Sequence, residues 1–288
     1  MSIKYALITP VKNEELFFPK CAQSVTDQTI KPQKWIIIND NSTDKTGDII
    51  SNLAKQHNWI ETINNKELIN TKRRIGGQAV IHLGLQRINF GDYDFIIRMD
   101  GDVLFEPDFF QKIFQKFEQN PDLGIASGVC YVEEDNKLME EKNPNFHTRG
   151  PLKIYKSKCL HDIGGLIQEE GWDTIDEIKA NMLGWETRNF DELRVIHLRR
   201  TQSASGALRG FLNQGYVAYF IGYHPLFMLL RAIRKMFIRP FIIGGIYLYA
   251  GYLHGFIKRA PRFEDKKITN YMREQQINKI LGKESIWK

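Results

Sequence analysis

Cysteine is rare in this sequence of 288 residues, and Cys21, Cys130 and Cys159 form no Cys-x-x-Cys pair. An odd number of scattered cysteines argues against a disulfide framework and against a zinc site, and it suits a reducing compartment. The first ten residues lack the basic start, apolar run and small-residue cleavage site of a signal peptide, so we expect no secretory leader. The overall composition excludes disordered and fibrous proteins.

Acidic residues are scarce in the last third of the chain. From Arg199 to the end there are 16 Lys and Arg but only 4 Asp and Glu, whereas residues 1–198 hold 24 against 30. This asymmetry predicts a catalytic or binding domain over residues 1–200, followed by an extension over residues 201–288 that meets anions. Nucleic acid and an anionic membrane surface are the two candidates for the anion.

Short apolar runs typical of strands alternate with segments of helical periodicity. Strands are predicted at residues 3–8, 34–38 and 93–99. Helices are predicted at 15–28, after 44, at 76–87 and around 110–117. Strands separated by helices of this length indicate an α/β fold, with a mostly parallel sheet flanked by helices.

Acidic side chains follow two of the predicted strands. The segment Asn39-Asp40-Asn41-Ser42-Thr43-Asp44 comes after one strand, and Asp100-Gly101-Asp102 comes directly after another. Ligands of such sheets sit beyond the carboxyl ends of the strands, so we expect these acids to converge on one crevice. Mg²⁺ and Mn²⁺ prefer carboxylate oxygens together with substrate phosphates. The alternative for Asp100 and Asp102 is a turn that only caps the next element.

A third acidic cluster lies at the start of a predicted helix. Ile175, Ile178, Met182 and Leu183 share one helical face, which places Asp173 at the N-terminus of the helix, where a carboxylate is favoured. Asp176 and Glu177 follow one turn later. Plain capping is one explanation for Asp173, and a general base tuned by the apolar ring of Trp172 is the other.

Four segments, in order over roughly residues 5–200, resemble family-two glycosyltransferases with the GT-A fold. They are ALITPVKNEELFFPKCAQSVTDQT, IIINDNSTDKT, IIRMDGD, and the Gly-Trp-Asp segment followed by MLGW. The resemblance implies a GT-A sheet, Mg²⁺ or Mn²⁺, and a nucleotide-diphospho-sugar donor, linked to UDP or GDP, whose anomeric centre is inverted. It also implies a nucleotide pocket lined by Thr9, Pro10 and Glu14, a hydrogen bond from the base to Asp40, and contacts of Asp100 and Asp102 with ribose and metal.

The resemblance further implies a catalytic Asp within a Glu-Asp pair. Counting back eleven residues from Gly184 gives Asp173, which follows Trp172 where the family has Glu. The departure leaves Asp173 as the first candidate for the base and keeps Asp176 and Glu177 as alternatives. No Gln-x-x-Arg-Trp motif of the polymerising members follows, so a single addition is expected.

Two further side chains are candidates for the same site. His197, in RVIHLRR, is either a late metal or phosphate ligand or a structural histidine at a strand end. Arg73 and Arg74, beside a glycine pair, suit a diphosphate, and the alternative is that they face solvent.

The basic extension carries an apolar stretch of 17 residues, 241–257, which contains His254 and four glycines. This length is at the low end for a membrane span. Helices lying in the membrane interface, with cations that attract anionic lipid, fit it better. A packed hydrophobic hairpin is the alternative. Nucleic acid is excluded because the cations are interleaved with aliphatic residues.

The sequence therefore predicts a metal-dependent, inverting sugar transferase at the cytoplasmic face of a membrane, with a lipid-linked or growing glycan as acceptor. A non-catalytic nucleotide-sugar-binding protein at the membrane is the second hypothesis, because the Glu of the Glu-Asp pair is missing. A sugar nucleotidyltransferase is a third hypothesis, but the segment ITPVKNEE contains no glycine-rich, basic loop.

Overall fold

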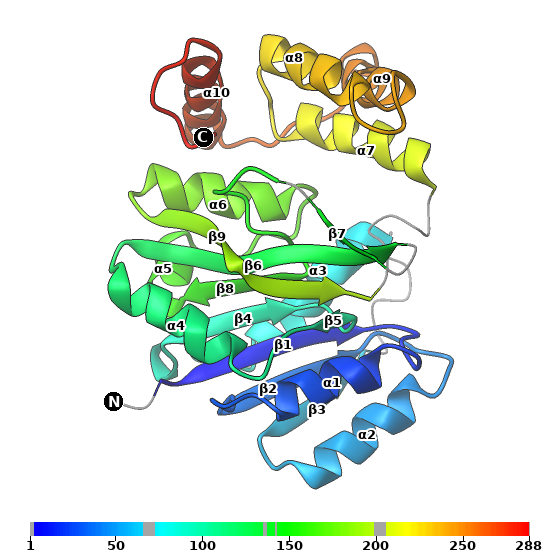
Figure 1. Ribbon diagram of the computed structural model, residues 1–288, viewed down its shortest axis with the longest axis vertical. Coiled ribbons are helices and arrows are strands. Elements are labelled where there is room, and N and C mark those ends of the chain that lie inside the picture. The colour runs from blue at the N-terminus through cyan, green and yellow to red at the C-terminus, as the bar shows by residue number, and fades with distance from the viewer. Residues whose placement is uncertain (1–2, 66–72, 135–136, 142, 199–205, 288) are drawn as a thin grey trace. The chain divides into compact units, whose positions relative to one another are not determined.

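A computed structural model describes residues 3–65, 73–134, 137–141, 143–198 and 206–287 (Figure 1). The chain divides into two compact units. The first unit holds residues 1–169 and 183–199, and the second unit holds residues 170–182 and 200–288. The second unit thus includes a helix from the middle of the chain in addition to the segment after residue 200.

A curved sheet of nine strands forms the centre of the first unit, as far as the structure describes it. The strands are β1 (Tyr5–Val11), β2 (Lys34–Asn39), β3 (Ile60–Asn64), β4 (Phe95–Met99), β5 (Val103–Leu104), β6 (Leu123–Glu134), β7 (Lys137–Glu140), β8 (Leu152–Lys156) and β9 (Glu186–His197). Their order is β3-β2-β1-β4-β8-β6-β9-β5, and β7 pairs with β6. All except β5, β7 and β8 point the same way. The predicted α/β fold with a mostly parallel sheet is therefore confirmed.

Helices cover the sheet of the first unit on both sides (Figure 1). They are α1 (Phe18–Thr26), α2 (Thr46–Gln56), α3 (Arg73–Leu85), α4 (Phe109–Gln119) and α5 (Ser157–Asp162), with a short 3₁₀ turn η1 (Phe90–Asp92). The central strands are apolar along their length because a parallel sheet is buried on both faces. On one face Tyr5 packs against Phe110 and Phe114 of α4. On the other face Ile8 and Ile38 lie directly beneath Gly84 of α3.

The second unit is helical. It contains α6 (Trp172–Met182), α7 (Ala207–Phe220), α8 (Pro225–Met236), α9 (Ile243–Ile257) and α10 (Lys266–Ile280). Pro225 opens α8, and the His224 side chain accepts a hydrogen bond from the Leu226 backbone. Asp265 caps α10 in the same way. In the described part of the chain no helix combines the length and the apolar character needed to cross a membrane.

Glycine allows α7 and α9 to approach each other closely. A Cβ at Gly251 of α9 would collide with the backbone carbonyl of Leu212 in α7, and one at Gly215 would collide with the carbonyl of Leu248. A further glycine, Gly245, lies against the Ala232 carbonyl of α8 in the same manner. The apolar stretch predicted at 241–257 is therefore a helix that packs through its glycine face.

Candidate active site

The loops that follow β1 and β2 are fastened to each other. The Glu14 backbone N–H donates to the Thr46 hydroxyl (2.8 Å), and the Thr43 N–H donates to the Asn13 side chain (2.8 Å). The Glu15 N–H donates to the Asp44 carboxylate (3.2 Å). The hydroxyl and carboxyl residues after β2 thus satisfy the backbone of a neighbouring loop, which fixes the carboxyl edge of the sheet.

Thr9 and Pro10, predicted to line the nucleotide pocket, lie at the end of β1. Thr9 is wholly buried, and its hydroxyl accepts a hydrogen bond from the indole N–H of Trp35 (2.9 Å). Pro10 is half-buried. In this structure Thr9 supports the strand end from within the core, and its contact with a nucleotide stays a prediction.

Asp40 lies where β2 ends, between the ends of β1 and β3. Its backbone N–H donates to the Val11 carbonyl (2.8 Å). One carboxylate oxygen accepts from the amide of Asn65 (2.7 Å), and the other lies 3.5 Å from the ammonium of Lys12. The Asp40 side chain is about one-fifth accessible (22%), so it retains room to accept a further N–H.

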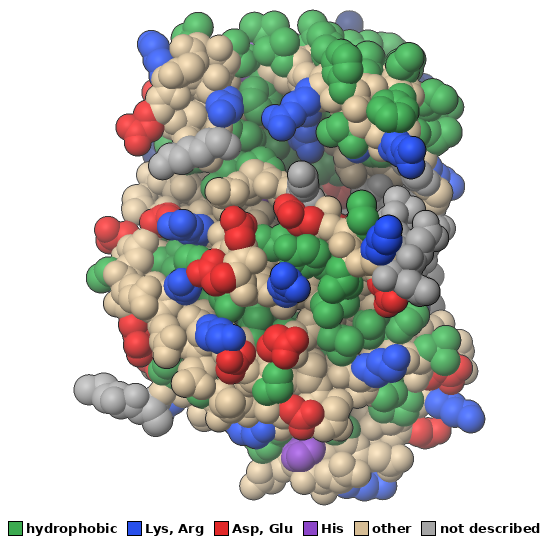
Figure 2. Space-filling model, in the orientation of Figure 1, with side chains coloured by type: hydrophobic (Ala, Val, Ile, Leu, Met, Phe, Trp, Pro, Cys, Tyr) green, Lys and Arg blue, Asp and Glu red, His purple; other side chains and the backbone are tan. Residues whose placement is uncertain are grey.

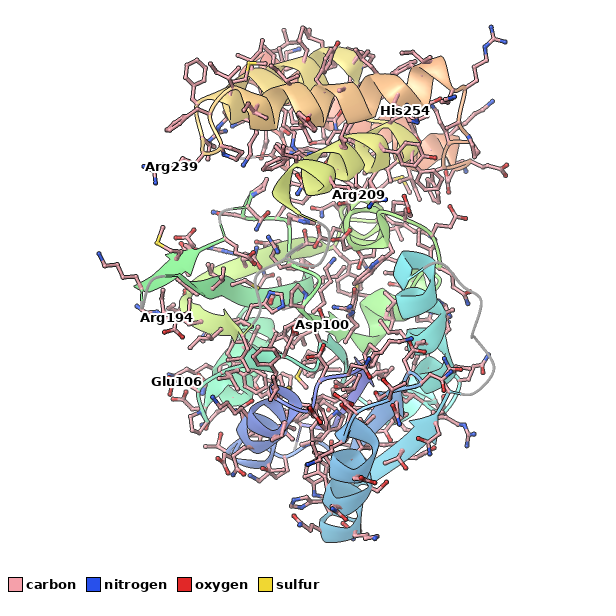
Figure 3. The ribbon with its side chains drawn as sticks, turned by 90° about the vertical axis from the view of Figure 1, so that its right-hand side faces the viewer. Asp100, Glu106, Arg194, Arg209, Arg239 and His254 are labelled. Atoms are coloured by element: carbon pink, nitrogen blue, oxygen red, sulfur yellow. The ribbon has the colours of Figure 1, made fainter. Side chains whose placement is uncertain are left out.

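Asp100 follows β4 in the first unit, and its side chain is about one-third exposed (31%) (Figure 3). Its carboxylate lies 2.8 Å from the guanidinium of Arg98. Desolvation raises the pKa of Asp100 above its ordinary value; the positive charge of Arg98 opposes this shift, and the charge of Asp102 adds to it. Two carboxylates close together, those of Asp100 and Asp102, disfavour each other's ionisation.

Asp102 and His197, 95 positions apart in the sequence, are in contact. The short strand β5 pairs with β9 and sets Val103 opposite His197. The Nε2 atom of His197 lies 3.4 Å from the Asp102 carboxylate, and both side chains are buried. Burial alone would lower the pKa of His197, but the hydrogen bond and negative charge of Asp102 raise it above its ordinary value. The predicted pair of metal ligands is therefore brought together.

Glu14 lies near the same acids. It is buried, at 8% exposed. The charges of Asp102, Asp100 and Glu14 all act on the buried thiol of Cys21, adding to the desolvation that raises its pKa. Cys21 itself donates to the Asp100 carbonyl (3.7 Å). Three of the predicted site carboxylates thus lie close enough to one buried thiol to disfavour its ionisation.

The donor set fits a divalent cation held partly by its substrate. Across the described residues, no three His, Cys, Asp or Glu side chains gather closely enough to hold a metal by themselves. Asp102 and His197 nevertheless present a carboxylate and an imidazole side by side, with the Asp100 carboxylate nearby. Mg²⁺ and Mn²⁺ commonly take one or two protein ligands and complete their shells with water and phosphate oxygens.

The predicted base residues belong to the second unit. As predicted, α6 begins just before Asp173, and Ile175 and Ile178 are buried. The expectation for Leu183 was wrong: it lies beyond the helix and is 49% exposed, because α6 ends at Met182.

Asp176 and Glu177 are buried, although the polar side of α6 was expected to face outward. Asp176 is 4% exposed and Glu177 is wholly buried. Desolvation raises the pKa of Tyr223; the Arg231 charge opposes this shift, whereas the charges of Asp173 and Glu177 add to it. The acids of α6 therefore share their surroundings with a tyrosine and an arginine of the same unit.

Some of these neighbours could not be predicted from the motifs. Arg98, Lys12 and Asn65 each contact a predicted site acid. For Arg98 a signal existed: it lies two residues before Asp100 in a strand, so both side chains point to the same side. Arg74 lies in α3, but its side chain falls outside the described residues.

Comparison with known proteins identifies the family. Residues 6–169 match the model of Glycosyl transferase family 2. The putative glycosyltransferase EpsH of Bacillus subtilis is 27% identical over 186 residues, which cover 64% of this chain and 50% of EpsH. GalNAc(5)-diNAcBac-PP-undecaprenol β-1,3-glucosyltransferase of Campylobacter jejuni is 25% identical over 138 residues, 48% of this chain and 41% of that enzyme. The chain thus spans half or less of the length of these relatives.

Two solved structures share the fold. Mannosyltransferase PcManGT of Pyrobaculum calidifontis, solved with GDP-Man and Mn²⁺, has a TM-score of 0.58 at 14% identity, covering 97% of this chain and 88% of that one. TarS residues 1–349 of S. aureus, solved with UDP-GlcNAc, has a TM-score of 0.57 at 14% identity, covering 96% and 81%. The family model covers more than half of the chain, and the chain therefore belongs to glycosyl transferase family 2 and has the GT-A fold.

Proposed function

We propose that this glycosyltransferase moves one sugar, with inversion, from a UDP- or GDP-linked donor to a lipid-linked or growing glycan acceptor at the cytoplasmic face of a membrane. The observation that carries the proposal is the meeting of Asp102 with His197, beside Asp100, at the carboxyl edge of the sheet. Two similar proteins support the proposal. One is named for an undecaprenol-linked acceptor, and the other was solved in complex with GDP-Man and Mn²⁺.

The donor nucleotide is bound by the ends of β1, β2 and β4. The partly exposed carboxylate of Asp40 accepts an N–H of the base, while Asn65 and Lys12 hold that carboxylate in place. Asp100, already paired with Arg98, accepts from the ribose hydroxyls. A carboxylate oriented by two partners loses little freedom when the nucleotide binds, which favours affinity.

Asp102 and His197 would hold the divalent cation. A bound Mn²⁺ or Mg²⁺ supplies positive charge to the nucleoside diphosphate as the bond to the sugar breaks. The protein's own part is to keep a buried carboxylate and imidazole side by side, with the pairing of β5 and β9 setting their separation.

Asp173 is the proposed general base. Its carboxylate takes the proton of an acceptor hydroxyl as that oxygen bonds to the anomeric carbon, and the bond from that carbon to the diphosphate oxygen breaks with its electron pair. Asp176 is the alternative base, with a lower exposed fraction. One sugar is added per acceptor because the chain lacks the Gln-x-x-Arg-Trp motif of the polymerising members.

Release of nucleoside diphosphate from a panel of nucleotide sugars, with Mn²⁺ present, tests the proposal against a non-catalytic binding protein. We expect release with at least one donor. Asp102→Asn should abolish this release and weaken donor binding, whereas Asp108→Asn, at a half-exposed acid of the same unit that pairs with Lys112, should change neither. Full activity of Asp102→Asn would refute the metal assignment, and donor binding without any release would favour the binding protein.

A further inference from the structure

Large apolar side chains are exposed mainly in one part of the second unit. Among the described residues, nineteen large hydrophobic side chains are exposed, and thirteen of them lie between Leu226 and Ile257. Figure 2 shows them gathered over α8 and α9, with Lys and Arg among them. A contiguous apolar surface of this kind usually marks an interaction site.

The exposed side chains of α8 form one stripe. They follow helical spacing from the first turn to just past the end of the helix: Leu226, Leu229, Leu230, Ile233 and Phe237. The opposite side of α8 carries the buried Met228 and Ala232. The helix thus has two apolar sides, one packed within the unit and one exposed as far as the structure describes the chain.

Helix α9 also has one buried side and one exposed apolar side. Its buried side is the glycine face that packs on α7 and α8, together with Leu248 and Tyr252. Its outer side carries Ile243, Ile246, Leu253 and Ile257 at helical spacing, each at least 40% exposed. Because Gly245 and Gly251 lie against backbone carbonyls, α9 cannot rotate to bury this outer stripe without breaking its packing.

The charge around these stripes has one sign. Between Glu192 and Glu264 the sequence contains no Asp or Glu, and residues 207–262 contain eight Lys and Arg. Lys235 lies over the ring of Phe211, and Arg262 lies over the ring of Tyr219. These two cations therefore contact aromatic side chains of the same unit. Four others are exposed and flank the stripes: Arg234, Arg239, Lys258 and Arg259. Figure 3 shows Arg239 and His254 at opposite ends of α9.

We propose that the outer stripes of α8 and α9, with these four cations, form a docking face for the surface of a bilayer rich in anionic phospholipid. We call it the α8–α9 face. The apolar stripes enter the boundary between headgroups and acyl chains, and the cations pair with lipid phosphates.

A second copy of the chain fits this face poorly. A two-fold contact would set the same cations against each other with no acid to neutralise them. A lipid surface supplies both an apolar layer and negative charge. The inference extends the proposed function, from which it takes the membrane-bound acceptor, but binding to vesicles is measured without donor or turnover.

Flotation of the full chain with vesicles tests the proposal. We expect binding to phosphatidylcholine vesicles that contain phosphatidylglycerol, weaker binding to pure phosphatidylcholine, and loss of the difference at high salt. Replacing Phe237 and Ile257 by Ser, both 77% exposed, should lower the partition coefficient at least about tenfold. Replacing Arg234, Arg239, Lys258 and Arg259 by Gln should lower it about fivefold per charge on anionic vesicles only.

Matched controls lie elsewhere on the chain. Leu281→Ser, at a position 61% exposed, and the pair Lys20→Gln with Lys55→Gln in the first unit should leave partition unchanged. Unfolding temperatures check that every variant folds, and nucleoside diphosphate release in the absence of vesicles reports on the proposed function separately.

Two results would overturn the proposed docking face. One is a failure of the wild-type chain to bind anionic vesicles, or binding of these vesicles by the α8–α9 variants that equals binding by the controls. The other is that the apolar variants convert a dimer to a monomer without changing vesicle binding, which would make the face a contact between copies.

Discussion

Exchanging Gly251 for alanine tests how α9 is packed. A Cβ at this position would collide with the Leu212 carbonyl, and backbone yields less easily than the end of a flexible side chain. Overpacking of a core costs about 1–3 kcal/mol, and a collision with backbone belongs at the upper end of that range. Alanine regains about 1 kcal/mol over glycine in helix propensity. We therefore expect Gly251→Ala to lose about 2 kcal/mol of unfolding free energy.

Gly244, in the same helix, provides the matched control. A Cβ there would meet only side-chain atoms, of Phe211 at 3.4 Å and of Lys235 and Pro240 at 3.6 Å, which are ordinary van der Waals contacts. Gly244→Ala should therefore be neutral or stabilising by up to about 1 kcal/mol. In thermal unfolding followed by circular dichroism, Gly251→Ala should lower Tm by roughly 4–8 °C relative to the wild type. A Gly251→Ala variant as stable as Gly244→Ala would refute the close packing of α9 on α7.

Three further predictions concern the site. Asp173→Asn should lower turnover about 100-fold or more with donor affinity nearly unchanged, because a base acts in the transition state. Asp176→Asn should cost less, and the reverse order in single-turnover kinetics would make Asp176 the base. Asp102→Asn should raise the Mn²⁺ concentration needed for half-maximal donor binding, as measured by calorimetry; an unchanged Mn²⁺ dependence would contradict the ligand role. Asn65→Ala should raise the donor KM about tenfold with kcat unchanged, since it removes a hydrogen bond to the Asp40 carboxylate; a fall in kcat alone would contradict this.

Much of the first unit could be predicted from the sequence because its signals are local. Four apolar residues before Asn39 predict a buried strand, and the acids after it fall at the carboxyl edge of a parallel sheet whatever the details of the loops. The same argument places the Asp100-Gly101-Asp102 turn at this edge, because it also comes directly after an apolar strand. Family motifs then suggested roles for these residues.

The contact between Asp102 and His197 depends on long-range pairing. It exists because a two-residue strand after Asp102 pairs with the end of β9. No periodicity in the sequence indicates that pairing, and only the family resemblance suggested a role for His197. Strand pairing across so many residues is set by tertiary packing, which local patterns do not encode.

The environment of the α6 acids could not be predicted either. Helical spacing placed Ile175 and Ile178 correctly on a buried side, but it offered no reason for Glu177 to be wholly buried. Its burial depends on which elements pack around α6, and within the second unit these include α10, about ninety residues later in the chain. A helical wheel treats every polar residue as outward-facing, and it fails where a second layer covers the polar side.

The anomeric configuration of the product tests the central claim most directly. The purified chain is supplied with Mn²⁺, an α-linked nucleotide-diphospho-sugar of gluco or galacto configuration, and an alkyl glycoside acceptor, and the H1–H2 coupling of the new glycoside is read by NMR. A single displacement assisted by one base predicts a β-linked product and an equal amount of nucleoside diphosphate. An α-linked product would contradict the account, as would donor that stays intact with every nucleotide sugar tested.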